Sequence, residues 1–262
     1  MSDTLRKYLD FAIETAWQAG KLTLGYFQTD LRPDFKADES PVTVADRQAE
    51  QFIRAKIEER YPDHLIVGEE YGGKELLNES TGPGFRWFID PIDGTRSFVR
   101  GVPLYAVLLA LEIEGQCQVG VANFPALGEM IAAARGEGCW WNGRRARVSA
   151  TAHLKDGLVC HYDIAAFDKH GRAEVLERLK QAAGYRVGWC DAYGYLLVAT
   201  GRAELMLDPI MDVWDCGPLL PILQEAGGYF GDWQGQATIY GREGLATTQA
   251  LLPEVLKLIH GK

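Results

Sequence analysis

The sequence predicts an α/β protein built from layers of helices and strands, and three observations support this fold class. Apolar residues recur at helical spacing over about the first 27 residues. Short apolar runs separated by glycine-containing turns fill the middle of the chain, which is typical of antiparallel strands. From about residue 158, strand and helix patterns alternate. We expect one domain over residues 1–262, with sub-domains near 1–157 and 158–262.

The first half of the chain begins with two predicted helices. The first covers about Thr4 to Phe27, and the second follows a polar, proline-containing loop over residues 35–46 and ends at Tyr61-Pro62-Asp63. After them, apolar runs predict strands at residues 65–67, 87–89, 102–112, 117–123 and 129–134, with a surface loop over 73–84. The Asn142-Gly143 pair predicts a hairpin turn after these strands.

The second half alternates strands with helices. Strands are expected at residues 158–162, 185–187 and 204–207, followed by the last strands of the chain. Helices are expected at 172–183, at 192–200, from about 215 to the Gly227-Gly228 pair, and at 254–259. Since glycines follow two of these helices directly, they mark the points where the helices end.

Composition and charge exclude several classes of protein. The net charge of −9 argues against nucleic acid and against an anionic membrane as partners. The five cysteines are widely spaced and form no CxxC pair, which indicates free thiols in a reducing compartment. The chain starts without an apolar signal segment, and its most apolar run, residues 102–113, is too short to cross a bilayer. We therefore expect a cytoplasmic protein.

The most informative stretch combines two acids with the end of a buried strand. Trp87 to Ile89 predicts that strand, and Pro91 is expected to end it because proline donates no N–H group. In an uninterrupted strand Asp90 and Asp93 would point to opposite faces, whereas a turn between them brings both carboxylates and the Ile92 carbonyl together. Such an oxygen cluster suits a hard cation such as Mg²⁺.

The two residues after this cluster predict a phosphate site. Gly94 lets the backbone approach a ligand closely. Thr95 is expected either to cap a following helix or to offer its hydroxyl to an attacking water, and N–H groups at a helix start favour phosphate. The alternative interpretation is that Asp-Pro and Asp-Gly pairs simply form turns.

Three further residues have both a structural and a functional interpretation. Glu69 follows a predicted strand among glycines, so it is either a loop acid or a ligand of the same cation. Asp46 is either an acid at the start of a helix or part of the site, and Lys36 is either a solvated lysine or a neighbour of the site. The five histidines are scattered, which gives no support for Ser-His-Asp or Cys-His catalysis.

Three motifs together resemble those of the inositol monophosphatase superfamily of Mg²⁺-dependent, lithium-sensitive phosphatases. They are Gly68-Glu69-Glu70, the segment Asp90-Pro91-Ile92-Asp93-Gly94-Thr95, and Trp214-Asp215 leading to Glu225-Ala226-Gly227-Gly228. Within that superfamily the segment 90–103, the segment 190–194 and Trp233 look most like the histidinol-phosphate phosphatase branch. The resemblance spans most of the chain.

The resemblance implies a five-layer α/β/α/β/α sandwich of the inositol monophosphatase and fructose-bisphosphatase type, a homodimer, and two or three Mg²⁺ ions with Mn²⁺ as an alternative. It implies that the metal ligands are Glu69, Asp90, the Ile92 carbonyl, Asp93 and Asp215, with Lys36 near a loosely held third ion. Thr95 and Asp46 would position and deprotonate the attacking water. The residues implied to line the substrate pocket are Asp93, Gly94, Thr95, Asp191, Ala192, Asp208 and Asp215. Asp208 stands where inositol-hydrolysing relatives carry a longer glutamate, which leaves its substrate contact open.

The resemblance implies hydrolysis of a small phosphate monoester, with L-histidinol phosphate of histidine biosynthesis as the first expectation. Alternatives within the superfamily are inositol 1-phosphate, sugar phosphates and 3′-phosphonucleotides. A phosphatase with an aspartyl nucleophile is disfavoured because that chemistry needs a DxD motif, whereas Asp90 and Asp93 form DxxD. A non-catalytic module that binds phosphate or metal is the remaining alternative.

Overall fold

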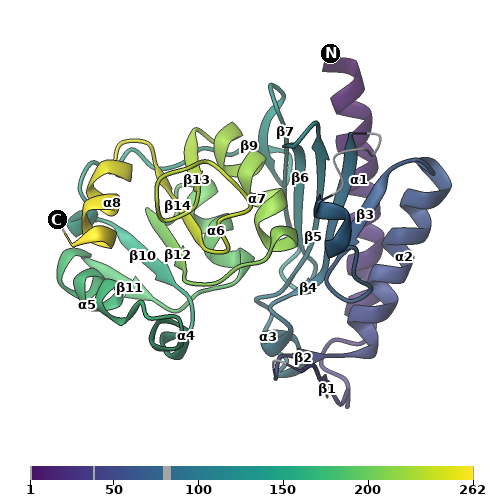
Figure 1. Ribbon diagram of the computed structural model, residues 1–262, viewed down its shortest axis with the longest axis horizontal. Coiled ribbons are helices and arrows are strands. Elements are labelled where there is room, and N and C mark those ends of the chain that lie inside the picture. Colours follow the sequence, from purple (N-terminus) through teal and green to yellow (C-terminus); the bar gives the residue numbers. More distant parts are fainter. Residues whose placement is uncertain (1, 38, 79–83, 262) are drawn as a thin grey trace.

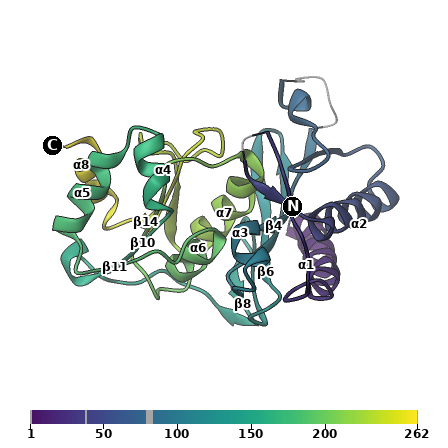
Figure 2. The same ribbon diagram turned by 90° about the horizontal axis from the view of Figure 1, so that it is seen from below.

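Two β-sheets alternate with three layers of helices in the computed structural model, which describes residues 2–37, 39–78 and 84–261 (Figure 1). The first sheet uses strands between residues 65 and 145, and the second uses strands between 158 and 248. One helix layer covers the outer face of each sheet, and the third lies between them (Figures 1 and 2). The predicted five-layer α/β/α/β/α sandwich is confirmed.

The first outer layer consists of α1 (Ser2–Leu24) and α2 (Val44–Arg60). The small side chains of Ala12, Ala16 and Ala19 are fully buried on α1 and allow it to lie close to the sheet. Ile53 and Ile57 of α2 join the same apolar cluster. Both predicted helices are confirmed, although the loop before α2 also holds a small hairpin of β1 (Asp34–Phe35) and β2 (Pro41–Val42) that was not predicted.

The seven strands of the first sheet lie side by side in chain order. They are β3 (Leu65–Gly68), β4 (Phe85–Asp93), β5 (Ala106–Ile113), β6 (Gln116–Phe124), β7 (Glu129–Ala134), β8 (Gly138–Trp141) and β9 (Arg144–Arg145). Only the β3–β4 pair is parallel, and the other neighbours are antiparallel. The Asn142-Gly143 turn joins β8 to β9, as predicted. The predicted strand over 102–112 starts later, at Ala106.

The central layer contains α6 (Ala192–Ala199) and α7 (Val213–Glu225), packed between the two sheets. Glycines allow α7 to lie very close to the first sheet. A Cβ atom at Gly120 of β6 would come within 2.2 Å of the Pro218 carbonyl oxygen. On α7 itself, a Cβ at Gly217 would lie 3.1 Å from the Ala110 side chain. This close approach brings the start of α7 near β4 and β5.

The second sheet has the strand order β11-β10-β12-β14-β13. Its strands are β10 (Leu158–His161), β11 (Tyr185–Val187), β12 (Leu205–Asp208), β13 (Gly228–Gly231) and β14 (Gly244–Thr248). Its outer face packs against α4 (Ile164–Lys169), α5 (Ala173–Ala182) and α8 (Leu252–His260). The remaining described elements are the short helix α3 (Thr95–Val99) and 3₁₀ turns at Leu154–Asp156 and Lys74–Asn78. Among the residues described, no helix is long and apolar enough to cross a lipid bilayer.

The structure differs from the sequence-based expectations at three further places. Pro91 does not end its strand, because β4 continues to Asp93 through an irregularity in its pairing with β5. Helix α4 was not predicted, since its six residues are too few to show a period. The predicted loop over 73–84 contains the 3₁₀ turn at Lys74–Asn78, and residues 79–83 lie outside the described part of the chain.

Candidate active site

A bulge in β4 aims Asp90 and Asp93 at the same face of the first sheet. Asp90 pairs with Leu108 of β5 and Asp93 pairs with Ala106, so three steps along β4 match two along β5. Because Leu108 and Ala106 are two residues apart, they share a face, and so do the acids opposite them. The predicted convergence of the two carboxylates is confirmed, but a bulge produces it where the sequence predicted a turn. Pro91 fits inside the bulge, where the regular ladder is interrupted.

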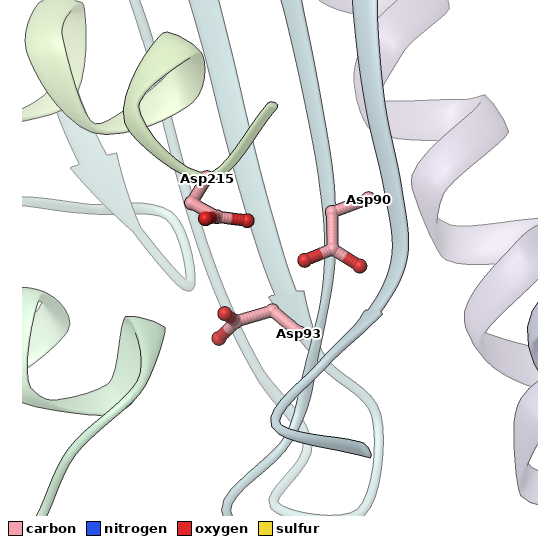
Figure 3. Close-up of side chains that lie close together, drawn as sticks. All are labelled: Asp90, Asp93 and Asp215. Atoms are coloured by element: carbon pink, nitrogen blue, oxygen red, sulfur yellow. The ribbon is translucent and has the colours of Figure 1, made fainter. Parts of the chain in front are cut away.

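Asp215 reaches the same place from the first turn of α7. Asp212 caps this helix, and its backbone N–H donates to Asp215 Oδ2 at 2.8 Å in a capping box. One carboxylate oxygen from each of Asp90, Asp93 and Asp215 lies within 4.8 Å of the other two. Figure 3 shows the three side chains pointing toward one another from β4 and α7.

The three acids lie so close together that their charged forms repel one another. Burial and the adjacent carboxylates raise the pKa of Asp90 and of Asp93 well above the usual range, and they raise the pKa of Asp215 to about 8. Among the described residues, no lysine or arginine forms an ion pair with any of the three. An all-oxygen cluster of this charge, left without a basic partner, fits a hard divalent cation.

Glu69 lies beside this cluster and also forms an ion pair with a lysine. Its charge is a further cause of the raised pKa of Asp90. Lys36 Nζ donates to Glu69 at 2.7 Å and to Glu70 at 2.6 Å. Burial lowers the pKa of Lys36, but the two carboxylates outweigh it and leave a net increase. The contact with Lys36 only partly offsets the effect of burial on Glu70, and burial raises the pKa of Glu70 to about 7.

Thr95 and Asp46 are connected by a hydrogen bond next to the bulge. The Thr95 hydroxyl lies 3.2 Å from Asp46 Oδ1 and 2.9 Å from the Ile92 carbonyl oxygen. Asp46 is fully buried, and burial raises its pKa. Its other oxygen accepts from the N–H and hydroxyl of Thr43 in a capping box. Asp46 therefore lies both at the start of α2 and beside Thr95, and its part in the reaction stays a prediction.

The expected helix cap by Thr95 is wrong. The short helix α3 (Thr95–Val99) has Gly94 as its N-cap residue, in a left-handed conformation with φ = 82°. A Cβ at Gly94 would lie 2.9 Å from the Leu104 carbonyl oxygen and 3.0 Å from Asp191 Oδ2. Glycine is required here for both reasons, and Thr95 is left free to direct its hydroxyl toward Asp46 and Ile92.

One open pocket of about 330 Å³ lies between the first sheet and the second half of the chain, and the predicted site residues that line it are Glu69, Asp90, Ile92, Asp93, Gly94, Thr95, Asp191 and Asp215. Lys36 and Asp46 are not among its lining residues. Asp191 lines it in a strained conformation, with φ = 54° and ψ = −159°, and burial raises its pKa to about 6. The N–H of Ala192 donates to Asp93 Oδ2 at 2.6 Å. Asp208 lines a smaller adjoining cavity of about 80 Å³, where the Tyr195 hydroxyl donates to it at 2.6 Å.

The pocket also contains residues that the sequence did not identify. Arg96, Tyr162, Asp163 and Cys190 line it, and Asp212 lies at its edge with Lys74 3.2 Å away. Arg96 directly follows Thr95, so its position after a phosphate-binding motif was an available signal. Tyr162 ends the strand predicted over 158–162 and Asp163 follows it directly, and only the arrangement of the two sheets shows that they line the pocket.

Comparisons with known proteins agree with the motifs. The model of the inositol monophosphatase family matches residues 4–261. A histidinol-phosphatase of Chlorobaculum parvum is 46% identical over 240 residues, 91% of each chain. A histidinol-phosphatase of Mycobacterium tuberculosis is 36% identical over 254 residues, 95% of this chain and 96% of that one. The structure of an IMPase of Thermotoga maritima superposes with a TM-score of 0.87 over 97% of both chains, at 28% identity.

Proposed function

The chain belongs to the inositol monophosphatase family and is a phosphomonoester hydrolase, and from this premise we propose that it hydrolyses L-histidinol phosphate in a reaction that requires Mg²⁺. The observation that carries the proposal is the cluster of Asp90, Asp93 and Asp215 beside the Gly94-Thr95 segment in one pocket. The names of the two histidinol-phosphatases above support the choice of substrate.

We propose that the metal ions are held by Glu69, Asp90, the Ile92 carbonyl, Asp93 and Asp215. Divalent cations at such a site lower the pKa of bound water and neutralise charge on phosphoryl and leaving-group oxygens. The bulge in β4 and the capping box of α7 hold the three aspartates in place before any ligand arrives. Lys36 fixes Glu69 through their 2.7 Å contact, and it would lie near a loosely held third ion.

Thr95 and Asp46 provide a route for the proton of the attacking water. The Thr95 hydroxyl accepts that proton while it donates its own toward Asp46 Oδ1, 3.2 Å away. Burial disfavours the charged form of Asp46 and so makes it a better proton acceptor than an exposed aspartate. The Ile92 carbonyl, 2.9 Å from the hydroxyl, restricts its orientation.

Two parts of the pocket bind the phosphate and the leaving group of the substrate. The backbone N–H groups of Gly94 and Thr95 bind the phosphate, because no Cβ at Gly94 blocks their approach. Asp191 and Ala192 line the space for the leaving group. Asp208 faces the adjoining small cavity and is held by Tyr195, so its contact with substrate depends on the leaving group reaching that cavity.

Phosphate release from a panel of monoesters with MgCl₂ tests this proposal. L-Histidinol phosphate should show a kcat/KM at least tenfold above those of inositol 1-phosphate, a sugar phosphate and a 3′-phosphonucleotide. Asp93→Asn and Asp215→Asn should each lower kcat by about 10³-fold while keeping the fold, because each removes a charged metal ligand. Equal or faster hydrolysis of inositol 1-phosphate would instead assign the chain to the family's other substrate class.

Homodimerisation and inhibition by lithium are also proposed, on family membership alone. Light scattering coupled to size-exclusion chromatography measures the mass, for which we expect twice the 29.1 kDa of one chain. An assay with LiCl at fixed Mg²⁺ measures the inhibition.

A further inference from the structure

Asp163 differs from the other acids that line the pocket in being exposed. Asp212 caps α7 and pairs with Lys74. Asp191 lies against Gly94, and the three clustered aspartates face one another. Asp163 belongs to the second half of the chain, just before α4, and its side chain is 49% exposed.

The two carboxylate oxygens of Asp163 have different surroundings. Oδ1 accepts from the Ala165 N–H at 3.2 Å and so caps α4. Oδ2 lies 3.9 Å from the Arg96 guanidinium, which is beyond hydrogen-bond distance. Both side chains of this pair are largely exposed, so the attraction between them is weak. A cation that enters the pocket can therefore displace Arg96 from Oδ2 at little cost.

Arg96 also locates Asp163 relative to the substrate. It directly follows Thr95, which belongs to the proposed phosphate-binding segment. Asp163 and that segment line the same pocket, and they come from different halves of the chain, so a leaving group bound beside the phosphate enters a space that the Asp163 carboxylate borders. In L-histidinol phosphate the carbon that bears the ammonium group is bonded to the carbon that bears the ester oxygen.

We infer that Asp163 is a specificity-determining residue, whose Oδ2 accepts a hydrogen bond from an ammonium group on the leaving alcohol. The inference rests on the proposed function and narrows it to phosphate esters of cationic amino alcohols. The hydroxyl of a neutral polyol can donate only an uncharged and weaker hydrogen bond to this carboxylate, and anionic leaving groups are repelled by it.

Kinetics of Asp163→Asn test the inference. Asparagine caps a helix as well as aspartate does, so α4 keeps its cap and only the charge is lost. For L-histidinol phosphate at pH 7.5, KM should rise about tenfold with kcat nearly unchanged, the effect of losing one charge-assisted hydrogen bond. For inositol 1-phosphate, KM should change less than twofold.

Two controls separate charge recognition from a structural effect. Asp168→Asn removes the same charge from an exposed residue of the same helix, and both kinetic constants should remain unchanged. The N-acetylated derivative of L-histidinol phosphate lacks the ammonium charge. The KM of the wild type should therefore be about tenfold higher for this derivative than for L-histidinol phosphate, whereas the KM of Asp163→Asn should hardly differ between the two esters.

The outcomes distinguish this inference from the proposed function. If kcat/KM falls equally for both esters in Asp163→Asn and in Arg96→Gln, Asp163 acts by positioning Arg96. If the ratio of kcat/KM between the two esters is unchanged in Asp163→Asn, Asp163 has no role in recognition. Either result overturns the inference alone. If the wild type hydrolyses inositol 1-phosphate but not L-histidinol phosphate, the proposed substrate is wrong, and the inference is wrong with it.

Discussion

Gly94 and Asp191 both have positive φ angles, which glycine adopts without strain and aspartate does not. Gly94 has φ = 82°, and any Cβ there would meet both Leu104 and Asp191. Asp191, with φ = 54° and ψ = −159°, occupies a region that costs a non-glycine residue about 1–3 kcal/mol. The start of α6 holds it there, since the next residue, Ala192, donates its N–H to Asp93. The two halves of the chain are thus connected at the site itself.

Thr95 yields a prediction with a matched pair of variants. Thr95→Ala removes the hydroxyl between Asp46 and the Ile92 carbonyl, and kcat should fall by about 10²–10⁴-fold because the proton route is lost. Thr95→Ser keeps the hydroxyl and should retain kcat within about tenfold. Thermal stability should be similar in both. Equal activity of the two variants would show that the Thr95 hydroxyl is not part of the reaction.

Helix α2 positions the segment that carries Glu69. Its Glu50 side chain is fully buried, and it accepts from the N–H groups of Glu70 at 2.7 Å and Tyr71 at 3.2 Å. Arg54, one turn further along α2, neutralises it at 2.7 Å. Gly68 leaves room for this carboxylate, since a Cβ there would lie 2.0 Å from Glu50 Oε1. The orientation of Glu69 therefore depends on a helix outside the pocket.

Substitution of Glu50 should weaken metal activation without touching a metal ligand. Glu50→Ala leaves Arg54 unpaired and should lower the free energy of unfolding by about 3–5 kcal/mol. Glu50→Gln keeps the size and one acceptor oxygen, so it should fold and require a severalfold higher Mg²⁺ concentration for half-maximal activity. Glu58→Ala, at an exposed position of the same helix, is the control. A Mg²⁺ dependence of Glu50→Gln identical to that of the wild type would contradict this role.

Across the whole molecule, the acidic cluster links stability to pH and metal. The pKa of Asp215 is near 8 in the folded protein and about 3.8 when unfolded, so the folded state holds its proton more tightly. The stabilisation from this group is fully present below pH 3.8 and is lost as pH rises toward 8. The pKa values of Asp90 and Asp93 are also raised in the folded protein.

Metal binding should therefore stabilise the fold more at high pH. The difference in Tm between samples with MgCl₂ and with EDTA should grow from pH 5.5 to pH 8.0, since protons compete with the cation for the same carboxylates. Differential scanning fluorimetry measures it, and other titrating groups largely cancel in the difference. Asp215→Asn should flatten the trend. A difference that shrinks as pH rises would contradict the proposed linkage.

The sequence predicted what depends on local pattern and missed what depends on distant contacts. The long helices, most strands, the Asn142-Gly143 turn and the convergence of Asp90 with Asp93 follow from periodicity and motif. The bulge at Pro91 was missed because it is defined by pairing with β5. The contacts of Glu50 and the place of Asp163 in the pocket could not be predicted, because they join segments that only the folded chain brings together.

We propose that folding gathers separated carboxylates into a site for divalent cations that binds a phosphate ester. The most direct test is anomalous diffraction from crystals soaked in MnCl₂ together with inorganic phosphate. We expect anomalous peaks coordinated by Asp90, Asp93 and Asp215, with phosphate at the N–H groups of Gly94 and Thr95. Well-ordered crystals with manganese elsewhere, and with these carboxylates free of metal, would show that they do not form the cation site.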